Sequence, residues 1–411
     1  MTRPSRTLVG RALGYFAVRD LIPLYAVYSL LFQDHGLSMG QISSLLVIWS
    51  LTAFVTELPS GALADAVSRR GLLVLSSVLY AVGFSLWTAV PSYSAFAAGF
   101  VLWGVSGSLM SGTFEALLYD QLAAQRATES YPRLMGWANS LAMVAETLGT
   151  LLAAPLFALG GYALVGWASV GLAVLQALLA LCLPGAPPVA EADETVEAVP
   201  VVHAGFAHRY TAMLRSGVHE VAAHRPLRHL VLIASLLGGV LAFDEYFTFV
   251  AREHGAATQT VPLLVGLVSG GQMIGAALAG RTARFTSRAI GWMLATAAVL
   301  IAVGASEGQW IGFLAIGTGY GLAINTLIVI EARVQDAITG PARSTVTSLS
   351  GVLSESLAVT VFAVFAVGTA WFTVTTLLVA LSFAMAMVAA LVRRWLPAPV
   401  DAAGSDAAEV A

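Results

Sequence analysis

Apolar runs of about 20 residues constrain this chain more than any other feature, because a helical run of that length spans the hydrocarbon core of a bilayer. The spans predicted from these runs are 12–32, 39–62, 71–90, 95–121, 134–159, 162–183, 228–250, 260–280, 289–305, 309–332, 344–367 and 370–392. Hydrophobic residues make up 58% of the chain and charged residues only 10%, whereas soluble domains have about 25% charged residues. We therefore predict an all-α, polytopic membrane protein with twelve transmembrane helices. A soluble enzyme and a nucleic-acid binder are excluded.

Arginine orients the predicted spans. All 20 basic residues are arginine, and with a cytoplasmic N-terminus 19 of them fall in the inner segments, leaving only Arg252 outside. Because cytoplasmic loops of membrane proteins are enriched in Arg and Lys, we expect a multi-pass protein of the plasma (inner) membrane with both termini in the cytoplasm.

One long polar stretch, between the sixth and seventh spans, divides the chain. It predicts an N-terminal six-helix bundle over 1–183, a cytoplasmic linker over 184–226, a C-terminal six-helix bundle over 227–396 and a disordered tail over 397–411. The linker opens with prolines and acidic residues, which is typical of disorder. Its end, 206–224, has an apolar face and predicts a helix on the membrane surface.

Short runs recur at nearly constant offsets. Asp-His-Gly at 34–36 returns as Glu-His-Gly at 253–255, and Gly-Ala-Leu-Ala at 61–64 returns as Ala-Ala-Leu-Ala at 276–279. The matches lie at equivalent places in the two predicted halves and indicate a duplication of six spans. Internal repeats of this kind mark secondary transporters, whose halves rock around a site near the midplane.

The turn between the second and third spans carries a longer motif. It reads Gly61-Ala62-Leu63-Ala64-Asp65-Ala66-Val67-Ser68-Arg69-Arg70-Gly71-Leu72-Leu73. This resembles the signature loop of the major facilitator superfamily (MFS), roughly G-x-L-a-D-r-x-G-r-r-x-x-l, with departures at Ala66 and Ser68. The resemblance covers the whole membrane region. It implies two pseudo-symmetric six-helix bundles, the MFS fold.

Two further runs narrow the resemblance. The runs 57–61 and 111–120 are similar to a group of mostly uncharacterised prokaryotic members that are described as exporters. Drug–proton antiporters of the superfamily carry an Arg in the fourth span and a G-P-x-x-G-G motif in the fifth. This chain has neither, and Glu146 stands where the proline would lie.

Five carboxylates are candidates for the proton-coupling site or substrate cavity, because an ionisable residue within a span costs roughly 2.5–3.5 kcal/mol. Glu146 and Glu355 fall near the midplane of spans five and eleven, and Glu115 lies nearer the cytoplasmic half of span four. Asp20 and Asp244 lie in spans one and seven, which the resemblance implies line the cavity. Desolvation favours a neutral carboxyl, which would let it load and release a proton. The alternative is a hydrogen-bonded carboxyl that joins helices.

Other residues in these spans say less about the transport site than the carboxylates do. Asp20 adjoins Arg19, but successive residues on a helix point about 100° apart, so the two need not pair. Aromatic residues in spans one, four and seven could contact an apolar solute, although packing is the more common role for each. They are Tyr15, Phe16, Tyr25, Tyr28, Trp103, Phe114, Phe243, Tyr246, Phe247 and Phe249. Glycines in spans eight and ten are spaced for close helix packing.

Gly61, Asp65, Arg69, Arg70 and Asp120 form the predicted gate loop. Asp65 and Arg69 are four residues apart and could share a helix face. The resemblance implies that Asp65 meets the positive N-terminus of span eleven and that Arg69 reaches Asp120, which would hold an outward-facing state. The alternative is a solvated charge cluster at a turn.

We therefore expect a secondary active transporter of a small organic solute, with proton-coupled efflux of an amphipathic or hydrophobic compound preferred. Uptake of a neutral or cationic nutrient is the alternative, and a non-transporting receptor or scaffold is the competing class. The chain has no H-E-x-x-H or G-x-x-x-x-G-K motif and a single cysteine, Cys182, so we expect no enzyme, cofactor or metal. The expected partners are the substrate, protons and the lipid bilayer, with no nucleic acid, and the expected state is a monomer.

Overall fold

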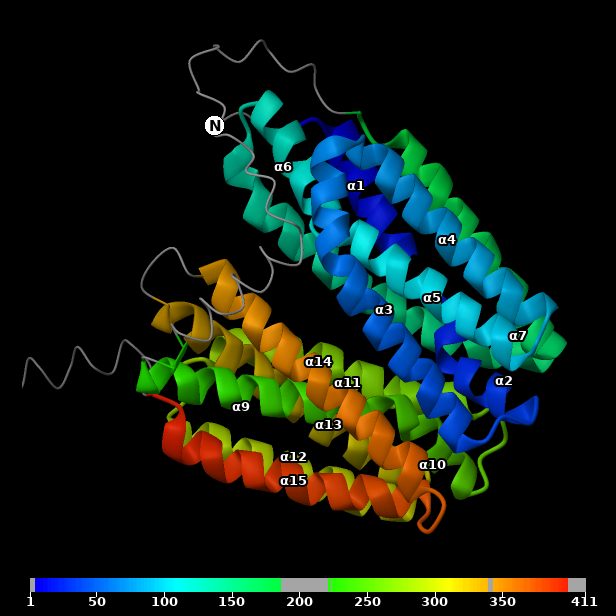
Figure 1. Cartoon of the computed structure of the whole chain (residues 1–411), viewed down its shortest axis with the longest axis vertical. Coiled ribbons are helices and arrows are strands. Elements are labelled where there is room, and N and C mark those ends of the chain that lie inside the picture. The colour runs from blue at the N-terminus through cyan, green and yellow to red at the C-terminus, as the bar shows by residue number, and fades with distance from the viewer. Residues whose placement is uncertain (1–3, 186–220, 223, 339–342, 398–411) are drawn as a thin grey trace, which may run out of the picture. The chain divides into compact units, whose positions relative to one another are not determined.

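The computed structural model of the chain describes residues 4–185, 221–222, 224–338 and 343–397 (Figure 1). Every element in these ranges is a helix. Up to residue 185 they are α1 (Arg6–Arg19), η1 (Pro23–Ala26), α2 (Tyr28–Asp34), α3 (Met39–Ala66), α4 (Arg69–Ala89), α5 (Tyr93–Met110), α6 (Thr113–Ala124), η2 (Thr128–Ser130) and α7 (Tyr131–Cys182). From residue 224 they are α9 (Arg225–Leu241), η3 (Ala242–Tyr246), α10 (Phe247–Glu253), α11 (Val261–Thr282), α12 (Ser287–Glu307), α13 (Trp310–Ala337), α14 (Arg343–Gly368) and α15 (Val374–Trp395).

The described helices form the twelve predicted spans. Eleven stretches are long and apolar enough to cross a membrane, and one of them, Thr128–Cys182, has 55 residues. That stretch holds two spans, because the backbone of Gly160 and Gly161 inside α7 is not helical. Gly161 has φ 59°, a conformation that glycine adopts without steric cost. The predicted boundary between spans five and six lies at this kink.

The chain divides into two compact units. One comprises 1–198 with 257–266, and the other comprises 199–256 with 267–411. In the first, α7 packs against α1 and α4, and α3 packs against α5; in the second, α9 packs against α14, and α12 packs against α13 and α15.

The predicted linker and tail fall mainly where the chain is not described. The surface helix expected over 206–224 and the tail expected over 397–411 lie almost entirely outside the described residues. The linker boundaries at 184 and 226 stay predictions.

The first and seventh spans are not continuous α-helices, although the hydropathy pattern predicts that both are. In span one, α1 ends at Arg19 and η1 precedes α2. Pro23 explains this break, because proline lacks an N–H donor and moves the preceding residue out of the helical region. Ile22 is accordingly extended, with φ −116° and ψ 99°. In span seven, η3 separates α9 from α10. Interrupted helices are where transporters place ligand and ion sites.

The repeated runs 34–36 and 253–255 adopt the same turn. Gly36 and Gly255 end it with φ 85° and φ 82°. Before them, the Nδ1 atoms of His35 and His254 lie 2.8 and 3.0 Å from the carbonyl oxygen four residues earlier. The equivalence of 34–36 and 253–255 is therefore structural as well as sequential.

Glycines bring α11 and α13 close together, as their spacing predicts. A Cβ atom added to Gly271 would collide with the carbonyl group of Gly317, and one added to Gly275 would collide with that of Gly321. The buried side chain of Asn325 on α13 also donates to the Gly275 carbonyl at 2.7 Å. Close backbone approach is a main source of helix association in lipid.

Candidate functional site

Asp20 pairs with Arg19, a contact that helical geometry did not require. Arg19 Nη2 lies 2.6 Å from Asp20 Oδ2, and Arg19 Nε donates to the same oxygen at 2.8 Å. Helical geometry applies only where both residues are helical. Instead, α1 ends at Arg19, and Asp20 has φ −103° and ψ 5°. Leaving the helix lets the carboxylate turn toward the guanidinium.

Aromatic rings lie beside this break in the first unit. Trp103 on α5 stacks on Tyr25, with ring centroids 4.9 Å apart and an interplanar angle of 5°, and on Phe100, at 5.7 Å and 7°. The ring centroids of Tyr80 and Trp103 are 6.1 Å apart. Tyr25 and Trp103 are partly exposed. The break therefore combines an ion pair of zero net charge with a π surface.

Asp244 lies in η3, at the break of span seven. It accepts a hydrogen bond from the Tyr320 hydroxyl on α13 at 2.7 Å. The Tyr320 ring is buried and packs edge-on against Phe247, with centroids 5.6 Å apart. Sequence reasoning missed Tyr320. The sequence feature that points to Tyr320 is a hydroxyl inside an apolar span, where lipid offers no hydrogen-bond partner.

The other three predicted carboxylates lie on helices away from these breaks. Glu146 on α7 and Glu355 on α14 are both partly buried. Glu115 lies in the first turn of α6, just after Gly112 interrupts span four with φ 70°. Its Oε2 atom is buried and has no hydrogen-bond partner among the described residues. An unpartnered buried oxygen is costly, so Glu115 stays a candidate for binding a proton or a ligand.

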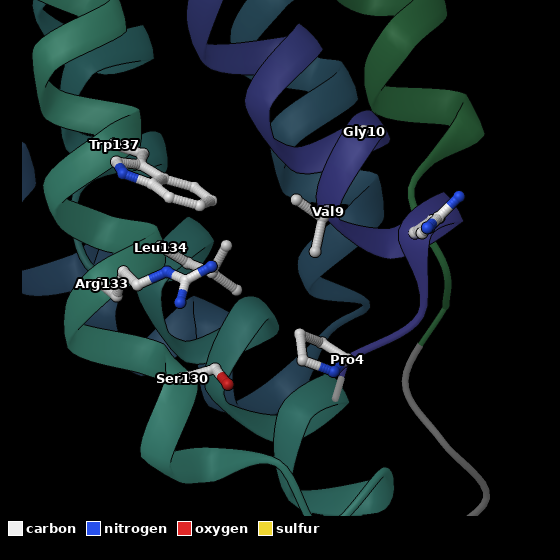
Figure 2. Close-up of a pocket in the computed structure, with 8 residues that line it drawn as sticks. Pro4, Val9, Gly10, Ser130, Arg133, Leu134 and Trp137 are labelled. Atoms are coloured by element: carbon white, nitrogen blue, oxygen red, sulfur yellow. The ribbon is translucent and has the colours of Figure 1, made fainter. Parts of the chain in front are cut away.

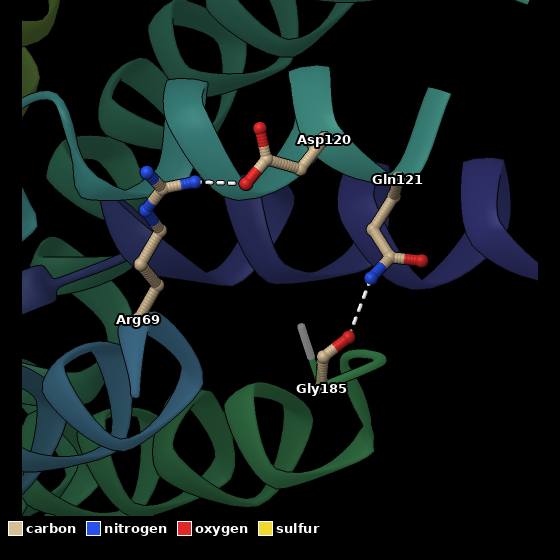
Figure 3. Close-up of polar contacts among 4 residues, drawn as sticks. All are labelled: Arg69, Asp120, Gln121 and Gly185. Carbon is tan, nitrogen blue, oxygen red and sulfur yellow. Dashed lines mark hydrogen bonds and ion pairs between the residues drawn. The ribbon is translucent and has the colours of Figure 1, made fainter. Parts of the chain in front are cut away.

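The gate loop contains the ion pair that the resemblance implies. The side chains of Arg69 on α4 and Asp120 on α6 pair, and beside them the Gln121 amide donates to the carbonyl of Gly185 (Figure 3). Arg70 Nη1 lies 3.5 Å from a carbonyl oxygen just beyond α7. The side chains of Arg69 and Asp120 are 25% and 43% exposed, and exposed pairs are worth about 0.2–1 kcal/mol. The contact is present, and its role as a gate stays a prediction.

The remaining gate-loop residues allow one correction. The Asp65 side chain and the surroundings of Gly61 lie outside the described part of the chain, so their predicted contacts stay predictions. However, α3 ends at Ala66, and α4 begins at Arg69 after Ser68, whose hydroxyl accepts a backbone N–H of α4 at 3.3 Å. Asp65 and Arg69 therefore belong to different helices and cannot share one helix face.

Several aromatic residues considered as solute contacts serve packing instead. Tyr15, Phe16 and Phe114 are at most 2% exposed, and the rings of Phe16 and Phe114 are 4.3 Å apart between centroids. In the second unit, Tyr246 stacks on Phe365, with ring centroids 3.6 Å apart. These rings join helices within each unit.

Known structures share this architecture. A mutant of the nucleoside transporter NupG is 12% identical to this chain, with a TM-score of 0.74 over 95% of this chain and 99% of that one. A D-xylose–proton symporter is 15% identical, with a TM-score of 0.66 over 96% and 98% of the two chains. A bacterial homologue of the human lysosomal transporter Spinster is also 15% identical, with a TM-score of 0.65 over 95% of each chain. These identities show a shared fold alone.

Sequence comparison identifies the family. No curated protein matches the sequence significantly. Residues 9–355 match the profile of the Major Facilitator Superfamily, and this range contains the gate loop, both interrupted spans and most of the twelve spans. The chain is therefore a multi-pass membrane protein that belongs to the Major Facilitator Superfamily.

Proposed function

We propose that the protein is a secondary active transporter that moves a small organic solute by alternating access and couples this movement to protons. Membership of the superfamily supports solute transport. The observation that carries the proposal is the pair of interrupted spans, because each break places a carboxylate against one partner. Asp20 meets Arg19, and Asp244 meets Tyr320.

Both contacts depend on protonation. A proton on Asp20 cancels its charge and weakens the bond to Arg19, and a proton on Asp244 weakens the charge-assisted bond from Tyr320. A hundredfold difference in proton affinity between inward-facing and outward-facing states is worth about 2.7 kcal/mol, comparable to known allosteric couplings. Glu146, Glu355 and Glu115 are further candidates for the coupling site.

The same residues suggest the kind of solute. Neither break offers unpaired positive charge, because Arg19 is paired with Asp20 and the partner of Asp244 is a tyrosine hydroxyl, so we favour a neutral or cationic solute over a phosphate or dicarboxylate, which needs fixed positive charge. The stacked rings of Tyr25 and Trp103 favour an apolar or amphipathic compound. We prefer export of such a compound. In this version the protein is a monomer of the plasma (inner) membrane, has both termini in the cytoplasm and is not an enzyme.

Proton symport for uptake is the second candidate. It is favoured by the fold neighbours, among which are a nucleoside transporter and a D-xylose–proton symporter. The two versions differ in the direction in which protons accompany the solute.

Proteoliposomes with a pH-sensitive dye inside distinguish these versions. When solutes from a chemically broad panel are added outside, antiport alkalinises the interior as solute enters, and symport acidifies it. This sign does not depend on the orientation of the protein in the vesicle. A solute that enters without any pH change would contradict proton coupling, and failure to move any solute would contradict transport itself.

A further inference from the structure

A cleft of about 520 Å³ opens between the beginnings of α1 and α7 in the first unit (Figure 2). Its lining residues are Pro4, Arg6, Val9, Gly10, Ser130, Arg133, Leu134 and Trp137. None of the five candidate coupling carboxylates and none of the gate-loop residues lines it, so it is separate from the proposed transport machinery.

The polar lining of the cleft supplies donors and positive charge. Arg6 and Arg133 line it, and no carboxylate is among its lining residues. Arg133 Cζ lies 4.4 Å from the Trp137 ring centroid, and both side chains project from α7 (Figure 2). This cation–π contact holds the guanidinium beside the ring, and a guanidinium carries five N–H donors that can bind a phosphate group. Ser130 precedes α7, and its side chain makes no capping hydrogen bond to that helix. The Arg133 guanidinium and the Ser130 hydroxyl supply donors for an anion with several oxygens, above all a phosphate group, and Arg6 adds a second positive charge to the lining.

The rest of the lining is apolar, which favours a lipid as the source of that phosphate. Val9 on α1 points toward Leu134 and Trp137 on α7 (Figure 2). Both helices are membrane spans that begin at the cleft, which puts it at the level of the lipid headgroups. Tryptophan is enriched at that level, and basic pockets between spans hold anionic headgroups. We propose that this cleft binds the phosphate headgroup of an anionic phospholipid.

Lipid titration of the purified full-length protein in detergent, followed by native mass spectrometry, tests the proposal. Wild type is expected to bind dioleoyl phosphatidylglycerol more tightly than dioleoyl phosphatidylcholine. Arg133→Gln is expected to weaken phosphatidylglycerol binding about five-fold, the usual effect of one basic residue near an anionic surface. Gly10→Leu provides a second variant. A Cβ at Gly10 meets no atom within 4 Å, so a larger side chain fits the fold and obstructs the cleft with both arginines intact.

The matched control is Arg393→Gln. Arg393 Cζ also lies 4.4 Å from a tryptophan ring, that of Trp292, but neither residue lines the cleft, so phosphatidylglycerol affinity should be unchanged. Inorganic phosphate is the soluble alternative and should not displace phosphatidylglycerol even in large excess. Equal affinity for the two lipids, wild-type affinity in both Arg133→Gln and Gly10→Leu, or displacement by inorganic phosphate would overturn the proposal.

Discussion

The Arg19–Asp20 ion pair can be tested by removing its charges singly and together. Asp20→Asn leaves the guanidinium without its carboxylate inside a membrane span, and Arg19→Gln leaves the carboxylate alone. A lone charge at such a position costs roughly 2.5–3.5 kcal/mol. The double variant removes both charges and leaves two neutral amides of similar size, so it should be more stable than either single variant.

The geometry sets the size of the effect. At the observed N–O distance of 2.6 Å and an effective dielectric constant of about 20, the gross attraction is about 6 kcal/mol. The two side chains are 24% and 23% exposed, so water competes for them, and the cost of desolvating both charges offsets much of the attraction. We expect each single variant to lose about 2 kcal/mol of unfolding free energy and the cycle to give a coupling energy of about 3 kcal/mol, so the double variant should lose only about 1 kcal/mol.

Equilibrium unfolding in mixed micelles, followed by circular dichroism, measures the unfolding free energy of the wild type, the two single variants and the double variant. Losses that simply add would refute the pairing, because non-interacting residues have no coupling energy. The same proteins separate structure from function. If Asp20 carries protons, the double variant regains stability without regaining proton-driven transport.

Other contacts predict smaller effects. Gly271→Ala should lower the unfolding free energy by about 1–3 kcal/mol in the same equilibrium unfolding assay, since its Cβ meets a carbonyl group of α13, whereas Gly270→Ala, where a Cβ meets nothing within 4 Å, should be tolerated. Tyr320→Phe removes the donor to Asp244 and should cost about 1.5–3 kcal/mol; unchanged stability would show that the bond contributes nothing. Arg69→Gln should change stability by less than about 1 kcal/mol and increase thiol labelling of cysteines introduced at the proposed cytoplasmic mouth. Unaltered labelling would argue against a gating role.

The spans could be predicted because a bilayer imposes both length and composition on each helix. The kink in α7 fell between the predicted spans 134–159 and 162–183, because two adjacent glycines mark it in the sequence. The break in span one also has a signal in the sequence, Pro23, to which mean hydropathy is insensitive. The break in span seven has no proline, and η3 is fixed by tertiary contacts such as that between Asp244 and Tyr320.

The candidate site was harder to predict than the spans, because its contacts depend on where helices end. Helical geometry did not require Arg19 and Asp20 to pair, but α1 stops between them. The same geometry joined Asp65 to Arg69, but a turn divides α3 from α4 there. A side chain beyond a helix terminus no longer follows the helical rotation of about 100° per residue, and helix boundaries predicted from sequence are uncertain by more than one residue.

Proton coupling at the interrupted spans is tested most directly by comparing proton-driven accumulation with solute exchange in one set of proteoliposomes. Asp20→Asn and Asp244→Asn are compared with Glu307→Gln, an exposed carboxylate at the end of α12. We predict that at least one aspartate variant loses accumulation against a gradient and keeps energy-independent exchange, and that Glu307→Gln keeps both. If both aspartate variants accumulate solute as well as wild type, the claim is wrong, and coupling would have to be sought at Glu146 or Glu355.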